Sequence, residues 1–360
     1  MDDLFEQIEQ SILNNRQRYF IENPVETIRL EQAPHPDSDE GRELVERVFD
    51  HYRTQGYPYV EAGDSRLRKD FLALQGQNIP IVDGQLRSNM VGLRIVNMFH
   101  QYMDSVRCRN YRTALDVFND DVFFRKAIRK MLLHAKEPGR TVGNRMRVHL
   151  LSYSGVQAVS NFRPGTAKSI YDHFRPKRVL DFSMGWGGRM LAAMAGGYTY
   201  VGIDPNIHAY KGNQTIRHKI RSLVRDQSFT VRLIRACAED VLGNQMFGAF
   251  DLIFTSPPYL DAEHYEESDF QSFRRHPTPD RWYEGFLKKC IVGSYHDLIP
   301  GGHLVLNVNP DMGDRTLEYA QGAGFNHTAT WRYLLSLRQQ NKKHDPTHVR
   351  GEPVFVFRRP

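Results

Sequence analysis

The chain has 360 residues, of which 40% are hydrophobic and 25% are charged, with 48 Lys and Arg against 42 Asp and Glu. This length predicts two domains rather than one, and the composition is that of a soluble globular protein. The net charge of +6 permits an anionic partner such as nucleic acid without establishing one. No apolar run approaches the ~20 residues of a membrane span, and the polar N-terminus is unlike a signal peptide, so we expect a cytoplasmic protein.

The three cysteines lie far apart, at Cys108, Cys237 and Cys290, and form no C-x-x-C pair. This spacing disfavours a disulfide framework and favours a reducing compartment. His344 and His348 have a ligand-like spacing, but no cysteine pair accompanies them. We therefore expect no metal site.

Residues 1–150 predict a mostly helical N-terminal domain. Apolar residues recur at helical spacing near the N-terminus and over 44–52, and further helices are expected over 88–106 and 121–136. Basic residues gather in 125–148. They form either a solvated helix face, the favoured interpretation for single residues, or collectively a surface for phosphates. We expect this domain to contribute to nucleic-acid recognition.

The pattern changes after about residue 155, where short β-rich runs alternate with helix-length segments. This predicts βαβ units and a parallel sheet in a second domain, residues 151–360. Only a polar loop separates the last two runs, so we expect a final antiparallel hairpin. The predicted fold class is α/β, a Rossmann-like core preceded by the helical domain. Seven strands are expected, at 178–181, 198–204, 229–234, 251–255, 303–308, 328–335 and 353–357.

Residues 250–259, FDLIFTSPPY, end a buried strand at two prolines, which lack amide hydrogens and turn the backbone rigidly. Such a turn aims the Ser256 hydroxyl and the Pro257 carbonyl at one point, with the Tyr259 ring beside them. Oxygens that accept N–H bonds and a ring for stacking suit a planar group with an exocyclic amine. An ordinary strand-ending turn is the alternative, because Ser and Pro are common in turns.

Three upstream strands also end in residues that can bind a ligand. Asp181 precedes the glycine-rich turn SMGWGG, where the backbone can approach a ligand closely. Asp204 can accept both hydroxyls of a ribose, and Glu239 and Asp240 stand where a carboxylate can meet an adenine amine. Each is a weak signal alone, because acidic residues often cap helices. Their order along the chain is much harder to obtain by chance.

In this order the residues resemble the S-adenosylmethionine-dependent class I methyltransferases that modify exocyclic amines of DNA bases. VLDFSMGWGG resembles their first motif, IDPN the ribose motif, CAED the adenine motif and TSPPY the catalytic motif. NFRP resembles the segment that covers the methionine end of the cofactor. The resemblance spans residues 155–360 and implies S-adenosylmethionine as cofactor. The cofactor-binding residues that it implies are Phe162, Pro164, Asp181, Ser183, Gly185, Gly187, Asp204, Pro205, Glu239, Asp240 and Thr255.

The resemblance also implies a reaction. Ser256, Pro257, Pro258 and Tyr259 would hold a flipped base for methyl transfer, and SPPY is typical of cytosine-N4 enzymes, whereas adenine-N6 enzymes more often carry NPPY or DPPY. The GWGGR turn resembles phage and bacterial methylase-like proteins. Carbon-5 methylation is disfavoured, because that route needs a Pro-Cys in this region and none is present.

In this family the motif order usually goes with a recognition domain after the core, for which no room remains here. Recognition of DNA, or of RNA as the alternative, would then come from residues 1–150 or from two charged segments. The first is 260–281, which is expected as a lid or as an exposed loop and holds Arg274 and Arg275. The second is the loop 338–350, with Lys342, Lys343 and Arg350.

Other functions stay open at this point. The same site could serve adenine N6, RNA, a protein amide, or transfer of the aminocarboxypropyl group in place of methyl. A binding protein that kept the fold and lost turnover is the alternative from another class. The intact glycine turn, the acidic residues and SPPY argue against such decay.

Overall fold

A computed structural model describes residues 23–225, 228–260, 263–265, 268–334 and 351–360. The chain forms two compact units and passes between them three times. The first unit holds the residues up to 59 and 103–159, and the second holds 60–102 and 160–360. The expected division near residue 150 differs from this one, because residues 60–102 pack with the second unit.

The first unit is largely helical in the part that the structure describes. Ser38 caps the N-terminus of helix α2 by accepting a hydrogen bond from the Gly41 amide, and Asp120 caps α6 by accepting from two amides. Val48, Phe124 and Ile128 are fully buried in its core. Its elements are η1 (Val25–Thr27), α2 (Asp39–Gln55), β2 (Arg107–Cys108), α5 (Ala114–Asn119), α6 (Asp121–His134) and α7 (Val142–Leu151), with η2 (Gln101–Ser105) at its edge.

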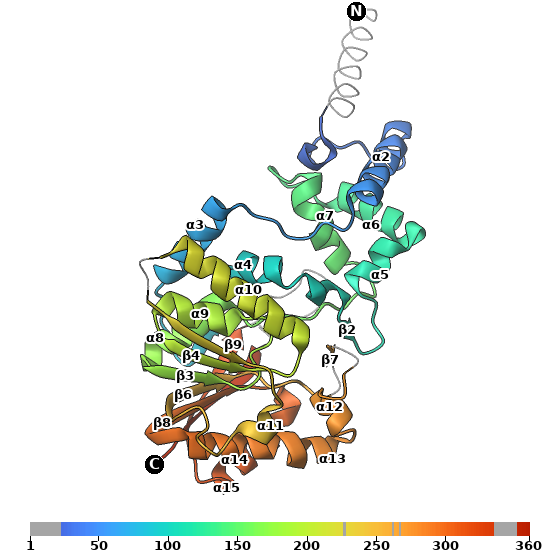
Figure 1. Ribbon diagram of the computed structural model, residues 1–360. Coiled ribbons are helices and arrows are strands. Elements are labelled where there is room, and N and C mark those ends of the chain that lie inside the picture. The colour runs from blue at the N-terminus through green and yellow to red at the C-terminus, as the bar shows by residue number, and fades with distance from the viewer. Residues whose placement is uncertain (1–22, 226–227, 261–262, 266–267, 335–350) are drawn as a thin grey trace, which may run out of the picture. The chain divides into compact units, whose positions relative to one another are not determined.

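The second unit is an α/β structure (Figure 1). Its strands are β1 (Gln85–Arg87), β3 (Arg178–Asp181), β4 (Thr199–Ile203), β5 (Thr230–Ile234), β6 (Phe250–Thr255), β7 (Glu263–His264), β8 (Leu298–Asn307), β9 (Asn326–Leu334) and β10 (Gly351–Arg358). Its helices are α3 (Asp64–Gln75), α4 (Leu93–Phe99), α8 (Pro164–Phe174), α9 (Gly188–Gly196), α10 (Ile207–Leu223), α11 (Ala238–Val241), α12 (Ser272–Arg275), α13 (Pro279–Trp282), the π-helical turn η3 (Tyr283–Leu287), α14 (Lys288–Asp297), η4 (Pro310–Met312) and α15 (Gly313–Gly322).

Eight of these strands form one sheet in the order β1-β9-β10-β8-β6-β3-β4-β5. Neighbouring strands run parallel except at β10, which lies antiparallel between β9 and β8. The antiparallel pairing of the last two predicted strands is therefore confirmed. Seven of the eight strands were predicted. The eighth, β1, comes from residues 60–102 and pairs parallel with β9 at the edge.

Both faces of the sheet are covered by helices, because successive buried residues of a strand point to opposite faces. Val179, Leu252 and Val305 pack in a core with α3, α4, α8, α9 and α10. Their chain neighbours, such as Leu180 and Ile253, pack on the other side with η3, α14 and α15. Figure 1 shows these two helical layers above and below the strands. The carboxyl ends of the parallel strands therefore meet at one edge, where a ligand crevice is expected.

The helix expected over 88–106 is shorter in the structure. Helix α4 begins after Gly92, which has a left-handed φ of 79°, and ends before His100. A separate 3₁₀ turn, η2, follows. The periodic apolar residues of this stretch therefore belong to two short elements, and His100 lies between them.

Candidate functional site

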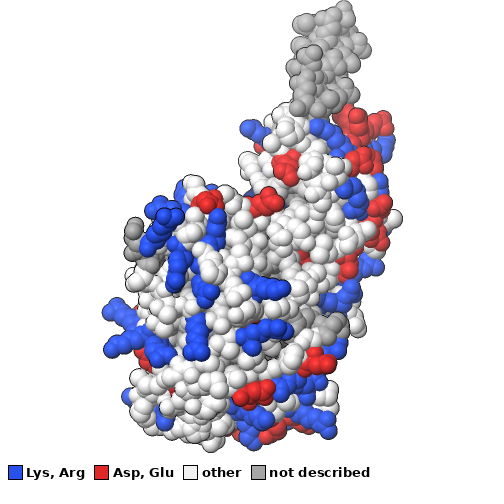
Figure 2. Space-filling view, in the orientation of Figure 1, with Lys and Arg blue, Asp and Glu red and all other residues white. Residues whose placement is uncertain are grey.

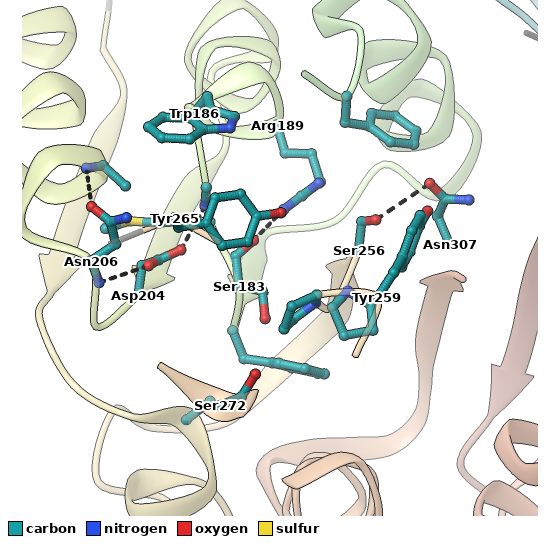
Figure 3. A pocket seen from close by; sticks show the side chains of 18 of the residues that line it. Ser183, Trp186, Arg189, Asp204, Asn206, Ser256, Tyr259, Tyr265, Ser272 and Asn307 are labelled. Atoms are coloured by element: carbon teal, nitrogen blue, oxygen red, sulfur yellow. Dashed lines mark hydrogen bonds between the residues drawn. The ribbon is translucent and has the colours of Figure 1, made fainter. Parts of the chain in front are cut away.

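A cavity of about 350 Å³ lies at the carboxyl ends of β3, β4 and β6 in the second unit. This volume is within the range of small-molecule sites. Figure 3 shows Asp204 and Asn206 on one side and Ser256, Tyr259 and Asn307 on the other. The sequence-predicted residues that line the cavity are Phe162, Ser183, Gly185, Asp204, Pro205, Glu239, Ser256, Pro257, Pro258 and Tyr259.

The glycine turn between β3 and α9 forms one wall. Gly185 has a φ of 49°, in the left-handed region that favours glycine. A Cβ atom at Gly185 would meet only the Ser183 carbonyl oxygen, at 3.8 Å, so the space beside it is open. The Gly185 backbone is therefore accessible to a molecule that enters the cavity.

Asp204 follows β4 and faces the cavity with both carboxylate oxygens held in place. The Gly185 amide donates to Oδ2 and the Asn206 amide donates to Oδ1, both over 2.9 Å. Burial raises the pKa of Asp204 to about 6, against the lowering effect of these two hydrogen bonds. Each carboxylate oxygen keeps a further lone pair, so Asp204 can still accept two hydroxyl groups.

The two acidic residues after β5 differ in position. The side chain of Glu239 is 3% exposed, lines the cavity, and is held by Arg275 at 2.8 Å and His276 at 3.4 Å, both at Oε1. The side chain of Asp240 is 52% exposed and pairs with Arg275 at 2.9 Å instead of lining the cavity. Glu239 is therefore the better candidate for an adenine amine.

Asp181 was expected to bind the cofactor, but the structure places it behind the cavity wall. It is fully buried and pairs with Arg189, with 2.8 Å between Oδ2 and Nε. Tyr200 Oη and Thr255 Oγ1 also donate to it, over 2.6 and 2.8 Å. Asp181 and Thr255 thus support the site from within the sheet. Pro164 and Gly187 are likewise outside the cavity lining.

The SPPY turn at the end of β6 is joined to two residues that the motif did not reveal. Ser256 Oγ donates to Asn307 Oδ1 over 3.4 Å, and Asn307 Nδ2 donates to Glu352 over 3.1 Å. The Tyr259 hydroxyl donates to the same Glu352 oxygen over 3.0 Å. Asn307 ends β8 and Glu352 lies on β10. The pairing of β8 with β6 brings Asn307 to the turn, and the pairing of β10 with β8 brings Glu352 there, so no local pattern could have found them.

Aromatic and sulfur groups complete the lining. Trp186 and Tyr265 contact each other at a ring-centroid distance of 5.9 Å, and in Figure 3 the Tyr265 ring lies between the two sides of the cavity. The Cys237 thiol also lines the cavity, and burial raises its pKa, so it stays protonated near neutral pH. A protonated thiol is a poor nucleophile, which agrees with the expectation that carbon-5 methylation is disfavoured.

Two of the arginines predicted to contact nucleic acid, Arg274 and Arg275, lie beside acidic side chains, which makes them less available to phosphates. Arg275 is engaged by Glu239 and Asp240, and Arg274 lies 3.8 Å from Asp269. Lys342, Lys343 and Arg350 lie outside the described residues, as do His344 and His348. In the 125–148 stretch most basic residues have partners within the first unit: Arg125 with Glu46, Arg129 with Asp37, Arg140 with Glu137, Arg147 with Asp104, and Lys136 with the Ala33 carbonyl.

Comparison with known proteins gives only remote likenesses. No family model and no curated protein matches the chain. A SAM-dependent methyltransferase from Methanosarcina mazei is 15% identical with a TM-score of 0.36, over 53% of this chain and 96% of that one. A TehB-like SAM-dependent methyltransferase from Corynebacterium glutamicum is 14% identical with a TM-score of 0.37, over 60% and 96%. The tRNA (m1A58) methyltransferase TrmI from Aquifex aeolicus is 14% identical with a TM-score of 0.37, over 56% and 71%.

Similarities this remote do not identify the substrate. The substrate class has to be inferred from the residues that line the cavity. Within the described ranges, no helix is long and apolar enough to cross a membrane. In the same part of the chain, no group of three or more His, Cys, Asp or Glu side chains is placed to hold a metal ion.

Proposed function

We propose that this protein transfers a methyl group from S-adenosylmethionine to an exocyclic amine of a DNA base, with cytosine N4 as the first candidate. One observation carries the proposal. A carboxylate suited to a ribose, Asp204, and a hydroxyl suited to an amine, Ser256, line the same cavity. The two groups come from the ends of different strands, β4 and β6, so the fold brings them together.

The residues present fit this cofactor. Asp204 offers acceptors for the two ribose hydroxyls, Glu239 offers one for the adenine amine, and the open space beside Gly185 leaves room for the ligand. Phe162 and Arg163 lie at the wall where the resemblance puts the methionine end. When bound, S-adenosylmethionine supplies an electrophilic methyl group on a sulfonium and requires no metal.

The hydrogen bonds of the SPPY turn support a role in holding an amine. Because Asn307 donates its amide hydrogens to Glu352 and the Pro353 carbonyl, its oxygen faces Ser256. The Ser256 hydroxyl therefore donates to Asn307, which leaves its lone pairs to accept an N–H bond. Such a bond increases electron density on a conjugated amine nitrogen and orients it for attack. The Pro257 carbonyl would accept the second hydrogen, and the Tyr259 ring would stack on the base.

A basic face of the second unit supports a nucleic-acid acceptor. Residues 207–225 contain five Lys and Arg and no Asp or Glu. Arg217 and Arg221 donate to backbone carbonyls of the β5 segment, so their charge is not neutralised by carboxylates there. Lys219 alone in this stretch pairs with a described carboxylate, that of Asp64. Figure 2 shows Lys and Arg gathered over α3 and α10. Uncompensated cations of this kind attract phosphates.

The test is methyl transfer with isotopically labelled S-adenosylmethionine to DNA and, in parallel, to RNA. Both products are digested and the nucleosides are identified by mass spectrometry. We expect label in N4-methylcytosine. Label in 5-methylcytosine would contradict the mechanism, and label confined to RNA or to protein would replace DNA as the acceptor.

Two variants separate the cofactor claim from the acceptor claim. Calorimetric titration should show saturable binding of S-adenosylmethionine that weakens by about 10- to 100-fold in Asp204→Ala, which removes hydrogen bonds to a charged group. Absence of binding to the unaltered protein would end the cofactor claim. The acceptor claim is tested at Lys211 and Arg225, two of the five basic residues in 207–225. Replacing both by Gln should make DNA binding less dependent on salt, by the equivalent of up to ~2 phosphate contacts. Arg125→Gln is the control, because Glu46 already neutralises the charge of Arg125 in the unaltered protein.

A further inference from the structure

His100 lies outside the cavity lining, after the C-terminus of α4, yet buried hydrogen bonds link it to the glycine turn. Its Nε2 lies 3.0 Å from Asn213 Oδ1, and Asn213 Nδ2 donates to the Gly185 carbonyl over 2.8 Å. His100 is 3% exposed and Asn213 is fully buried. Three segments that are distant in sequence, α4, α10 and the turn after β3, therefore share one chain of hydrogen bonds.

The direction of these bonds follows from their last acceptor. A carbonyl oxygen only accepts, so the Asn213 amide nitrogen must face Gly185 and its oxygen must face His100. The imidazole then has to donate from Nε2. Burial lowers the pKa of His100 to about 4, which keeps the ring neutral near neutral pH. A neutral imidazole protonated at Nε2 satisfies Asn213 and adds no buried charge.

Two glycines make room for this chain of bonds. A Cβ atom at Gly187 would lie 2.2 Å from Asn213 Oδ1, and one at Gly212 would lie 2.3 Å from Cε1 of His100. Neither distance is compatible with a side chain. The Trp186 ring and the imidazole pack edge to face, with the centroids 5.5 Å apart. Gly187, Gly212 and Trp186 thus pack closely around the two hydrogen bonds.

We propose that His100, acting through Asn213, is a positioning residue that fixes the backbone at Gly185 and thereby the orientation of Asp204. Gly185 is held at both of its backbone polar groups, because its amide donates to Asp204 Oδ2 over 2.9 Å while its carbonyl accepts from Asn213. The consequence for cofactor affinity rests on the proposed function. The ordering of the turn does not, because it involves this chain's residues alone.

The experiment uses the full chain without cofactor and with it. Amide hydrogen exchange of the peptide covering residues 182–189 is measured by mass spectrometry on the free protein, and S-adenosylmethionine is titrated by calorimetry. His100→Ala should speed exchange in this peptide by about tenfold and weaken binding by about tenfold, the net effect of one lost hydrogen bond. His100→Gln retains an N–H donor and should restore most of both. Val96→Ala, a truncation on α4, which precedes His100, should change neither.

Unchanged exchange in His100→Ala would overturn the proposal, and so would equal losses in His100→Ala and His100→Gln, which would indicate packing alone. If His100→Ala does not fold, His100→Phe fills the space without an N–H and takes its place. If the unaltered protein does not bind S-adenosylmethionine, the proposed function fails. The exchange measurement then still decides whether His100 orders the turn.

Discussion

The two ends of the cavity are built in different ways. At the cofactor end, backbone amides hold Asp204, and the carboxylate of Asp181 is locked to Arg189 inside the sheet. At the proposed acceptor end, side chains hold one another, from Ser256 through Asn307 to Glu352. The first end is therefore fixed by the fold itself. The second depends on a few side-chain hydrogen bonds, so single substitutions there should change reaction or specificity without unfolding the protein.

The largest effect on stability should come from the buried Asp181–Arg189 pair that supports the cofactor end. Asp181→Ala leaves Arg189 buried without its partner, which we expect to lower the free energy of unfolding by about 3–5 kcal/mol. Urea denaturation measures this change. Glu46→Ala, which breaks an exposed pair with Arg125, should change stability little. If Asp181→Ala were stable but unable to bind S-adenosylmethionine, Asp181 would be a direct ligand after all.

At the acceptor end, Ser256→Ala should lower the rate of methyl transfer by about 100-fold, the usual effect of losing one preorganised hydrogen-bonding group. The affinity for S-adenosylmethionine should stay the same, because Ser256 belongs to the other end of the cavity. Single-turnover kinetics and calorimetry measure the two quantities. Ser256→Thr keeps the hydroxyl and serves as the control. Parallel losses of rate and affinity would show that the two ends are not separable.

A smaller effect is expected at Tyr259, where ring and hydroxyl can be tested apart. Tyr259→Ala should weaken capture of the base by the ~1–3 kcal/mol that aromatic stacking supplies. Tyr259→Phe keeps the ring and removes the hydroxyl that donates to Glu352, so its effect should be about 1 kcal/mol or less. Binding of DNA with an unpaired target base measures both. Equal effects would indicate that the hydroxyl, and not stacking, matters.

The smallest effect is the pH dependence of the cofactor end. The raised pKa of Asp204, about 6, means that its carboxylate is protonated as the pH falls through that value and loses acceptor capacity. Affinity for S-adenosylmethionine should therefore be about fourfold lower at pH ~5.5 than at pH ~7.5. Asp204→Asn should flatten this profile. For the free protein the sign is opposite: the folded state binds the proton more tightly, so stability rises as the pH falls from 6 toward the ordinary pKa.

Much of the second unit could be predicted because its strands are short apolar runs that end in acidic residues, glycines or prolines. These signals also indicated the positions of Asp204, Glu239 and the SPPY turn. Strand β1 escaped prediction because three residues, QLR, show no measurable periodicity. The sequence alone could not show that Asp181 lies behind the cavity wall whereas Asp204 lines the cavity. The lone Arg189 at the start of the apolar helix RMLAAMA was the available signal, since a buried cation needs a buried partner.

The acceptor end could be predicted only in part, for a physical reason. Its local motif could be recognised in the sequence, but Asn307 reaches the motif through the pairing of β8 with β6, and Glu352 through the pairing of β10 with β8. The role of His100 could not be predicted for the same reason. Its neighbours in sequence predict a helix, and only the packing of α4 against α10 places it beside Asn213.

The pairing of β1 with β9 also bears on how the protein is made. Leu86 lies opposite Tyr333, so the segment that carries α3, β1 and α4 leaves the ribosome on the order of 250 residues before its partner strand. At ~5–20 residues per second, this interval is tens of seconds. During this time apolar side chains such as Phe71, Leu74 and Ile95 have no completed core to enter. The nascent chain should therefore depend on chaperone protection until synthesis is nearly complete, and fragments that end before β9 should aggregate.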